Sequence, residues 1–204
     1  MNWRGATPLL AAALAATVAW PAAAGHGFMN SFADIEPLPA AGTTPDSRAW
    51  PLERLQERTL RYFAATPALA VAQAERNARE RLAEFLEVAR ATQADLTMRA
   101  AQAYREDMAW ALAALPTEPG RETDRLRRRL AQSLLEQQYL LSLAWFDIAR
   151  PARAEAETLG EWMQASYTRL RTQLSRGVAE SLFFKEEEVR WSWEMAVRGE
   201  ELEP

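Results

Sequence analysis

The chain has no cysteine and only one histidine among its 204 residues. The absence of cysteine excludes disulfides, iron–sulfur clusters and thiolate zinc sites. His26 precedes every helix we predict, so a serine or threonine nucleophile in those helices would lack an imidazole base. The sequence also lacks a glycine-rich phosphate loop, an HExxH motif, a calcium loop and the Glu-x-x-His pairs of di-iron bundles. These absences predict a protein that is not an enzyme and that holds no cofactor or metal.

An excess of basic residues is missing as well. The net charge is −4, and it becomes −5 when residues 1–24 are removed, which leaves 28 acidic against 23 basic residues. A mildly acidic chain is a poor general binder of nucleic acid, because phosphate binding needs a basic face. Beyond residue 24 there is no apolar run long enough to span a bilayer. We therefore expect neither a nucleic-acid partner nor a membrane span in the mature chain.

Residues 1–24 have the pattern of a secretory signal peptide. Arg4 gives a short positive start, an apolar stretch runs from Leu9 to Trp20, and three alanines end at Ala24. A membrane anchor is the alternative, but a span needs ~20 apolar residues and this stretch is shorter. We therefore predict export to a periplasm or to the outside of the cell, with a mature chain that begins near Gly25.

Alanine, leucine, glutamate, arginine and glutamine dominate the mature chain, and glycine is scarce. These common residues lose little on entering a helix, so the composition predicts an all-α fold. Apolar residues recur every three to four positions, and proline or threonine-proline pairs mark helix starts. We predict an antiparallel helical bundle of about five to six helices, without a repeat of fixed length. The expected helices are 51–65, 67–91, 93–115, 122–149, 151–176 and 178–197, with a single helix over 67–115 left open as an alternative.

The predicted organisation has four parts. Residues 1–24 form the signal peptide, 25–46 an extended lead-in, 47–177 the helical bundle, and 178–204 a tryptophan-rich helix and tail, with Gly177 as the stop between the last two. Within the lead-in, the apolar residues Phe28, Phe32 and Ile35 could pin part of the segment onto the body.

Periodicity also predicts which faces are buried. In helix 51–65 the apolar residues are expected to face inward, and in the other helices most charged residues are expected to face solvent. The inward set of the first helix is Leu52, Leu55, Thr59 and Tyr62 or Phe63. The outward set includes Arg81 and Glu84, and Glu106, Asp107, Glu155 and Glu157 are expected to be surface charge.

The segment after Gly177 is the most distinctive part of the sequence, because aromatic residues alternate there with charged ones. Phe183, Phe184, Trp191 and Trp193 are the candidate partner-binding residues, since tryptophan is enriched at protein interfaces. Ordinary packing of a last helix would explain Trp193 without a partner. Binding to a membrane interface is a third possibility, although three consecutive glutamates oppose an anionic surface.

Two further features have a simple and a functional interpretation. Arg125, Arg127, Arg128 and Arg129 form either a solvated face or a site for phosphate or lipid headgroups. His26 would lie near the terminus of the mature chain, where an amine, amides and an imidazole could chelate Cu²⁺ or Ni²⁺. A solvated histidine near a flexible terminus is the simpler interpretation.

The segment 45–55 reads PDSRAWPLERL and resembles the opening motif of an exported helical family, domain of unknown function 5667. The Thr66-Pro67 step, the RERLAE stretch over 79–84 and the PARA restart at Pro151 are similar to it too. The resemblance covers roughly residues 44–177. It implies an exported or membrane-tethered helical domain with no assigned catalysis, and it identifies no site residues.

These features together predict an exported, non-enzymatic helical-bundle protein that acts through protein–protein contacts, as an accessory, sensor-like or chaperone-like factor. Its partner is expected to be another exported or envelope protein. A periplasmic bundle that binds a metal or a small ligand is the alternative, and an enzyme of carboxylate-only chemistry is the third hypothesis.

Overall fold

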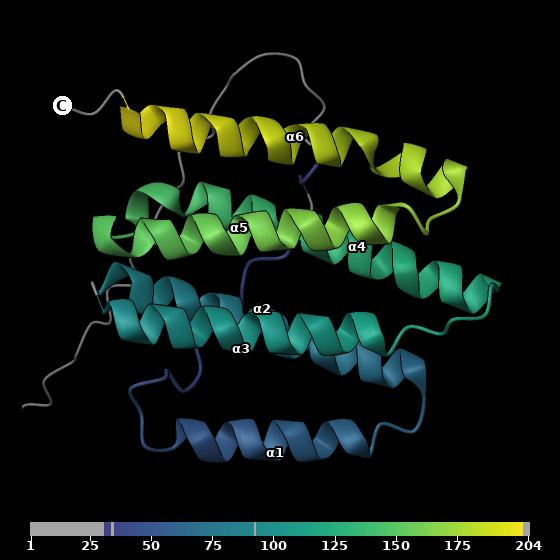
Figure 1. Ribbon diagram of the computed structural model, residues 1–204, viewed down its shortest axis with the longest axis horizontal. Helices are drawn as coiled ribbons and strands as arrows, with labels where there is room; N and C mark the ends of the chain where they lie inside the picture. The colour runs from purple at the N-terminus through teal and green to yellow at the C-terminus, as the bar shows by residue number, and fades with distance from the viewer. Residues whose placement is uncertain (1–30, 34, 92, 202–204) are drawn as a thin grey trace, which may run out of the picture.

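The computed structural model describes residues 31–33, 35–91 and 93–201, and its described part is all-α (Figure 1). His26, Phe28 and the predicted signal peptide lie outside the described residues. The described part contains six α-helices and one 3-10 helix, and no strand. The elements are α1 (Trp50–Tyr62), α2 (Pro67–Arg90), α3 (Ala94–Ala113), α4 (Arg121–Leu143), η1 (Trp145–Asp147), α5 (Arg150–Arg171) and α6 (Arg176–Glu201).

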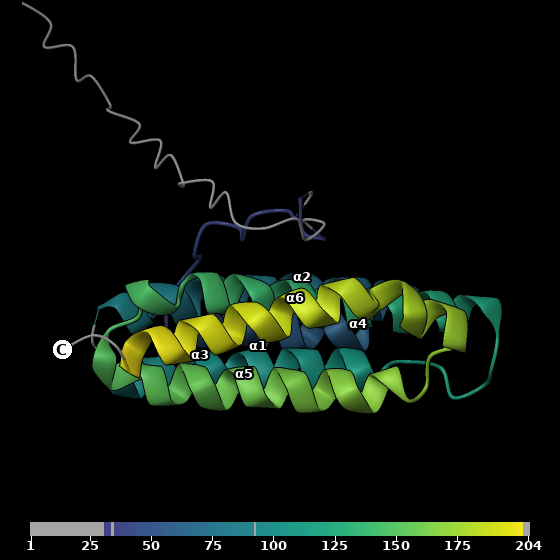
Figure 2. The ribbon, with the colours of Figure 1, turned by 90° about the horizontal axis from the view of Figure 1, so that it is seen from above.

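The helices form an elongated stack in which successive helices run in opposite directions (Figure 1). Helix α1 lies at one end of the stack, the pairs α2–α3 and α4–α5 form the middle, and α6 lies at the other end. Figure 2 shows α6 running along the top of the α4–α5 pair. The predicted antiparallel bundle is thereby confirmed, and among the described helices α1 and α6 each have helical neighbours on one side only.

Local signals explain most helix boundaries. The Thr66 side chain accepts a hydrogen bond of 3.3 Å from the Leu69 N–H and caps α2, and Pro67 takes a first-turn position where its missing N–H costs nothing. Helices α2 and α3 are separate, so the single-helix alternative is wrong. Gln93 is the N-cap residue of α3, but its side chain accepts no hydrogen bond from the first turn of the helix.

Two predicted boundaries are wrong. Helix α4 ends at Leu143, and the chain passes through η1 before α5, so the predicted helix 122–149 is too long. Helix α5 ends at Arg171, and Gly177 lies in the first turn of α6 instead of stopping the preceding helix. The start signal is Ser175, a preferred N-cap residue type, whose carbonyl accepts the Ala179 N–H at 3.0 Å.

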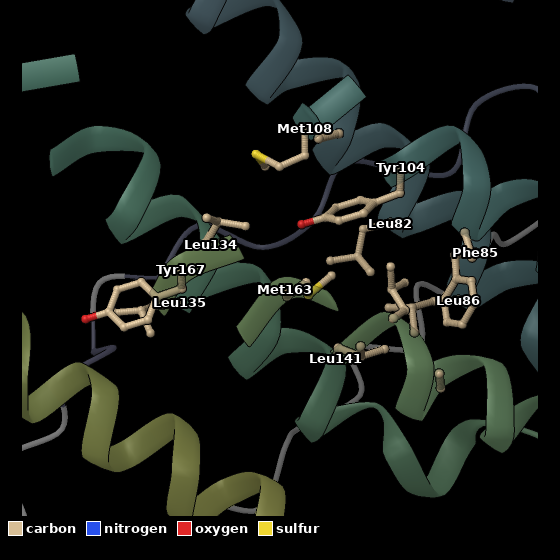
Figure 3. Packing of buried hydrophobic residues seen from close by; sticks show 14 of the residues in the cluster. Leu82, Phe85, Leu86, Tyr104, Met108, Leu134, Leu135, Leu141, Met163 and Tyr167 are labelled. Carbon is tan, nitrogen blue, oxygen red and sulfur yellow. The ribbon is translucent and has the colours of Figure 1, made fainter. Parts of the chain in front are cut away.

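The core lies where α2, α3, α4 and α5 meet (Figure 3). Its side chains are aliphatic, thioether and aromatic groups with almost no exposure, and each contributes about 1.5–3 kcal/mol by leaving water. Helix α4 supplies more than one buried face, as expected for a central helix. The largest contributors include Leu82, Phe85, Tyr104, Met108, Leu130, Leu134, Leu135, Leu141, Met163 and Tyr167.

The described part of the lead-in lies against the body, as predicted for Phe32. The Phe32 ring stacks on Tyr139 at a centroid distance of 4.3 Å, and the Lys185 ammonium lies 4.8 Å from the Phe32 centroid. Further along, the Arg79 guanidinium donates to the carbonyls of Glu36 and Pro37. These contacts tie the lead-in to α2, α4 and α6. Among the helices described, none combines the length and the apolar character needed to cross a membrane.

Candidate interaction surfaces

Three of the four candidate aromatic residues of α6 lie on the surface. Phe183, Phe184 and Trp191 are 47%, 56% and 63% exposed. The rings of Phe183 and Phe184 meet edge to face with centroids 5.6 Å apart. Phe184, Trp191 and the exposed Met195 are spaced by seven and four residues, so they share one side of the helix. We call the row Phe184, Trp191 and Met195 the α6 apolar row.

Trp193 points the other way, is half-buried and packs against the core. Its ring meets Trp145 edge to face with centroids 5.5 Å apart, and it packs directly on the backbone of α5 at Gly160. Leu182, Val189 and Ala196 are the buried residues on this side of α6. The α6 apolar row is therefore distinct from the side that holds α6 on the bundle.

Helix α1 has its apolar side outward, which contradicts the predicted burial of Leu52, Leu55 and Phe63. These three side chains are 69%, 62% and 77% exposed. Thr59, between them in the row, is also exposed. We call Leu52, Leu55, Thr59 and Phe63 the α1 outer row.

The buried side of α1 is charged. Arg54, Glu57 and Arg61 point toward α2 and α3 and have less than a tenth of their surface exposed. The Arg54 guanidinium donates two hydrogen bonds, of 2.7 and 3.1 Å, to the two carboxylate oxygens of Asp107 in α3. This bidentate geometry is typical of arginine–carboxylate pairs. Arg61 forms an ion pair with the same carboxylate and lies over the Trp110 ring. Asp107 is fully buried, so its predicted place among the surface charges is wrong.

A second part of this network centres on Arg81 of α2, which is fully buried together with Glu84. The Arg81 guanidinium donates to Glu84 at 2.6 Å, to Glu57 at 2.7 Å and to Glu53 at 3.0 Å. The Trp50 indole N–H also donates to Glu84, at 3.2 Å. The predicted exposure of Arg81 and Glu84 is wrong, because α1 covers them with side chains of matching charge.

Burial changes the titration of this network. Desolvation raises the pKa of Glu84 to about 7, although the neighbouring Arg81 and the Trp50 hydrogen bond act in the opposite direction. Desolvation, assisted by the Arg54 charge, lowers the pKa of Arg61 to about 10. Arg61 therefore stays cationic at neutral pH, whereas Glu84 titrates near neutral pH.

The remaining predicted acidic residues are engaged in ion pairs or exposed within 31–33, 35–91 and 93–201. Glu53, Glu57 and Glu80 place carboxylate oxygens within 4.8 Å of one another, but Arg81 already bonds to two of the three. A guanidinium in that position neutralises the carboxylates that a metal ion would need. Glu157 is exposed, as predicted, whereas Glu106 and Glu155 are partly buried in ion pairs with Arg58 and Arg105.

The predicted arginine cluster lines a shallow, open depression of about 280 Å³ between α2 and α4. Arg129 pairs with Glu75 across it at 2.6 Å, and Arg127 turns to the Pro116 carbonyl at 3.5 Å. Arg125 and Arg128 are exposed at its rim. Glu75 and Glu136 also line the depression, but Arg129 and Lys185 pair with them, so Arg125 and Arg128 give it a net positive lining.

Comparison of the chain with protein-family models, with curated proteins and with solved structures returned no match. The resemblance to domain of unknown function 5667 stays a prediction. The surfaces at α1 and α6 must therefore be interpreted from their own geometry and chemistry.

Proposed function

We propose that the chain is an exported, non-enzymatic helical-bundle protein that acts through protein–protein contacts, with the α6 apolar row as its binding surface. The observation that carries this proposal is the exposure of Trp191 between Phe184 and Met195 on a helix whose opposite side is buried. Exposed aromatic residues on a rigid helix lose little conformational entropy on binding and are typical interface anchors.

The charges around the row favour a protein partner over an anionic membrane. Glu180, Glu187 and Glu194 recur every seven residues and line one edge of the α6 apolar row, where Glu180 pairs with Arg176 and Glu187 pairs with Arg190. This edge therefore carries both signs of charge without the excess of basic residues that attracts an anionic lipid surface, and it can form ion pairs with a protein. Export to a periplasm or to the outside of the cell is part of the same proposal and is supported by the pattern of residues 1–24.

Site-specific photo-crosslinking tests this function. A photoreactive amino acid at position 191 should capture a discrete protein in intact cells, because Trp191 lies at the centre of the α6 apolar row. The matched control is the same probe at Glu157, which is exposed on α5 and lies outside both rows. Equal labelling at 157 and 191, or no protein adduct at 191, would contradict the proposal.

A further inference from the structure

The depression between α2 and α4 holds arginine charge that is not neutralised within the part of the chain that the structure describes. Arg125 and Arg128 are exposed at its rim, and neither forms a hydrogen bond or an ion pair with any described residue. The chain as a whole has a net charge of −4, so this positive excess is a local feature. We propose that the depression binds the phosphomonoester group of a small molecule or of a lipid headgroup.

One side of α4 supplies most of the lining. Arg125, Arg129, Gln132 and Glu136 follow one another at intervals of four, three and four residues, so their side chains lie on the same side of the helix. Arg128 lies directly beside this row. Because a single helix sets their spacing, the basic groups are gathered before a ligand arrives, which lowers the cost of binding.

The two carboxylates of the lining are already paired. Glu75 of α2 accepts a hydrogen bond of 2.6 Å from Nε of Arg129. Glu136 accepts from the Lys185 ammonium of α6 at 3.1 Å and from the Gln132 amide at 2.9 Å. These pairs cancel the negative charge of the depression and leave the excess of the two rim arginines. Because Arg129 uses Nε for its pair, its two Nη groups have no partner among the described residues and can donate to a ligand.

Ser133 adds a neutral donor at the inner side of the depression. The residue lines the depression and is only 2% exposed. Its Oγ accepts a hydrogen bond of 2.7 Å from the Gln137 amide. That bond uses a lone pair of Oγ, so the hydroxyl proton remains for a ligand oxygen.

These donors fit a phosphomonoester better than a carboxylate. A phosphomonoester has a charge of about −2 near neutral pH and three terminal oxygens, which matches two unpaired guanidinium charges and the further donors beside them. Guanidinium groups bind phosphate oxygens in pairs, through parallel N–H bonds. A carboxylate offers one charge and two oxygens and would leave one arginine without a counter-charge. The volume of about 280 Å³ suits a phosphate group with a small attached part.

Calorimetric titration with glycerol 3-phosphate tests the proposal on the protein expressed from its full sequence. We expect saturable binding that weakens as salt is added. Arg125→Gln and Arg128→Gln should each weaken binding about five- to tenfold, because each guanidinium donates charge-assisted hydrogen bonds. Both side chains are exposed and unpaired, so the fold should persist, which circular dichroism checks. Arg99→Gln removes an exposed arginine of α3, is the matched control and should leave the affinity unchanged.

A second pair of titrations distinguishes the two sources of the phosphate group. Phosphatidylcholine vesicles that contain phosphatidic acid present a phosphomonoester on a membrane surface, whereas vesicles of phosphatidylcholine alone do not. Tighter binding to free glycerol 3-phosphate assigns the site to a soluble ligand, and tighter binding to the phosphatidic acid vesicles assigns it to a lipid. Either result supports the site, provided that Arg128→Gln weakens the binding.

Several results would overturn the inference. These are no saturable binding to either probe, an equal loss of affinity in Arg99→Gln and Arg128→Gln, or acetate binding as tightly as glycerol 3-phosphate. A single-stranded oligonucleotide that binds more tightly than both probes would also overturn it. The depression shares no residue with the α6 apolar row, so this inference and the proposed function can each fail without the other.

Discussion

At the scale of single residues, Gly160 shows how α5 makes room for α6. A Cβ at this position would lie 2.6 and 2.7 Å from two ring carbons of Trp193, closer than atoms can approach. The Trp193 ring is in turn held by Trp145, so it cannot simply swing aside. A glycine inside a helix is otherwise unfavourable, and its presence here follows from this contact.

Gly160→Ala is therefore expected to destabilise the protein. Overpacking against Trp193 outweighs the gain in helix propensity, and we expect a net loss of about 1–2 kcal/mol in the free energy of unfolding. Gly177→Ala is the matched control, because nothing lies within 4 Å of its Cβ position and it is in the first turn of α6. Urea denaturation followed by circular dichroism measures both. Equal effects of the two substitutions would contradict the packing role of Gly160.

Glu84 predicts a pH dependence of stability. Its pKa rises to about 7 in the fold from an ordinary value of 4.5, mainly by desolvation. A carboxyl with a raised pKa stabilises the fold fully below its unfolded pKa and loses that contribution as pH rises through the folded pKa. The stability of the unmodified protein relative to Glu84→Gln should thus fall by roughly 1–3 kcal/mol between pH 4.5 and pH 8. Parallel urea titrations across this range provide the measurement, and a difference that is constant or rises with pH would refute it.

The sequence contained a sign that Asp107 and Arg81 are buried, because both lie at or beside inward positions of the helical pattern. Asp107 is four residues from Ala103 and from Ala111, which are apolar and buried. Arg81 likewise precedes Leu82 at the edge of an apolar face. A charged residue at an inward position requires a partner of opposite charge. That partner comes from α1, distant in sequence, so it could not be identified before the fold was known.

At the scale of elements, α1 is the clearest difference between expectation and structure. Its amphipathic pattern correctly predicted a helix, but amphipathicity does not determine which side packs on the bundle. Arg54, Glu57 and Arg61 match the charges of Arg81 and Asp107 so closely that the polar side is buried. The other helices bury apolar sides, and for them the sequence-based faces largely agree with the structure.

This inversion predicts opposite sensitivities on the two sides of α1. Asp107→Asn removes the negative charge that the buried Arg54 and Arg61 share, with Glu57 still paired to Arg54, and should cost about 3–5 kcal/mol of stability. Leu55→Ser changes an exposed side chain and should alter stability by less than about 0.5 kcal/mol. Thermal and urea unfolding of both variants would measure this. If Leu55→Ser proved to be the more damaging change, α1 would have to pack with its apolar side inward.

The sequence contains recognisable signals for where the helices begin and end. These signals predict that a boundary exists, but they do not fix the residue at which it falls. Pro67 and Pro151 mark helix starts as predicted. Ser175 is the cap residue of α6, but Gly177 two residues later is typical of a helix end and therefore predicted a stop instead of a start. The 3-10 turn at η1 was missed because the apolar pattern continues through it, with Trp145 and Ile148 both buried.

At the scale of the whole molecule, the stack has two open ends. Helices α1 and α6 cover the α2–α3 and α4–α5 layers from opposite sides (Figure 1). The residues that predicted partner binding, Phe183, Phe184 and Trp191, lie at one end, and Leu52, Leu55 and Phe63 lie at the other. The sequence indicated the α6 surface directly. The α1 surface could be identified only from the structure, because there the charged side of α1 packs on α2 and α3 and the apolar side is left exposed.

Hydroxyl-radical footprinting of the protein, in dilute solution and in intact cells, tests most directly whether these ends are binding surfaces. In dilute solution, oxidation should be strong at Trp191 and weak at Trp193, in keeping with their different exposure. In intact cells the account predicts that Trp191 becomes protected, while the exposed Met98 stays as reactive as before. Equal oxidation of Trp191 in both conditions would contradict the account.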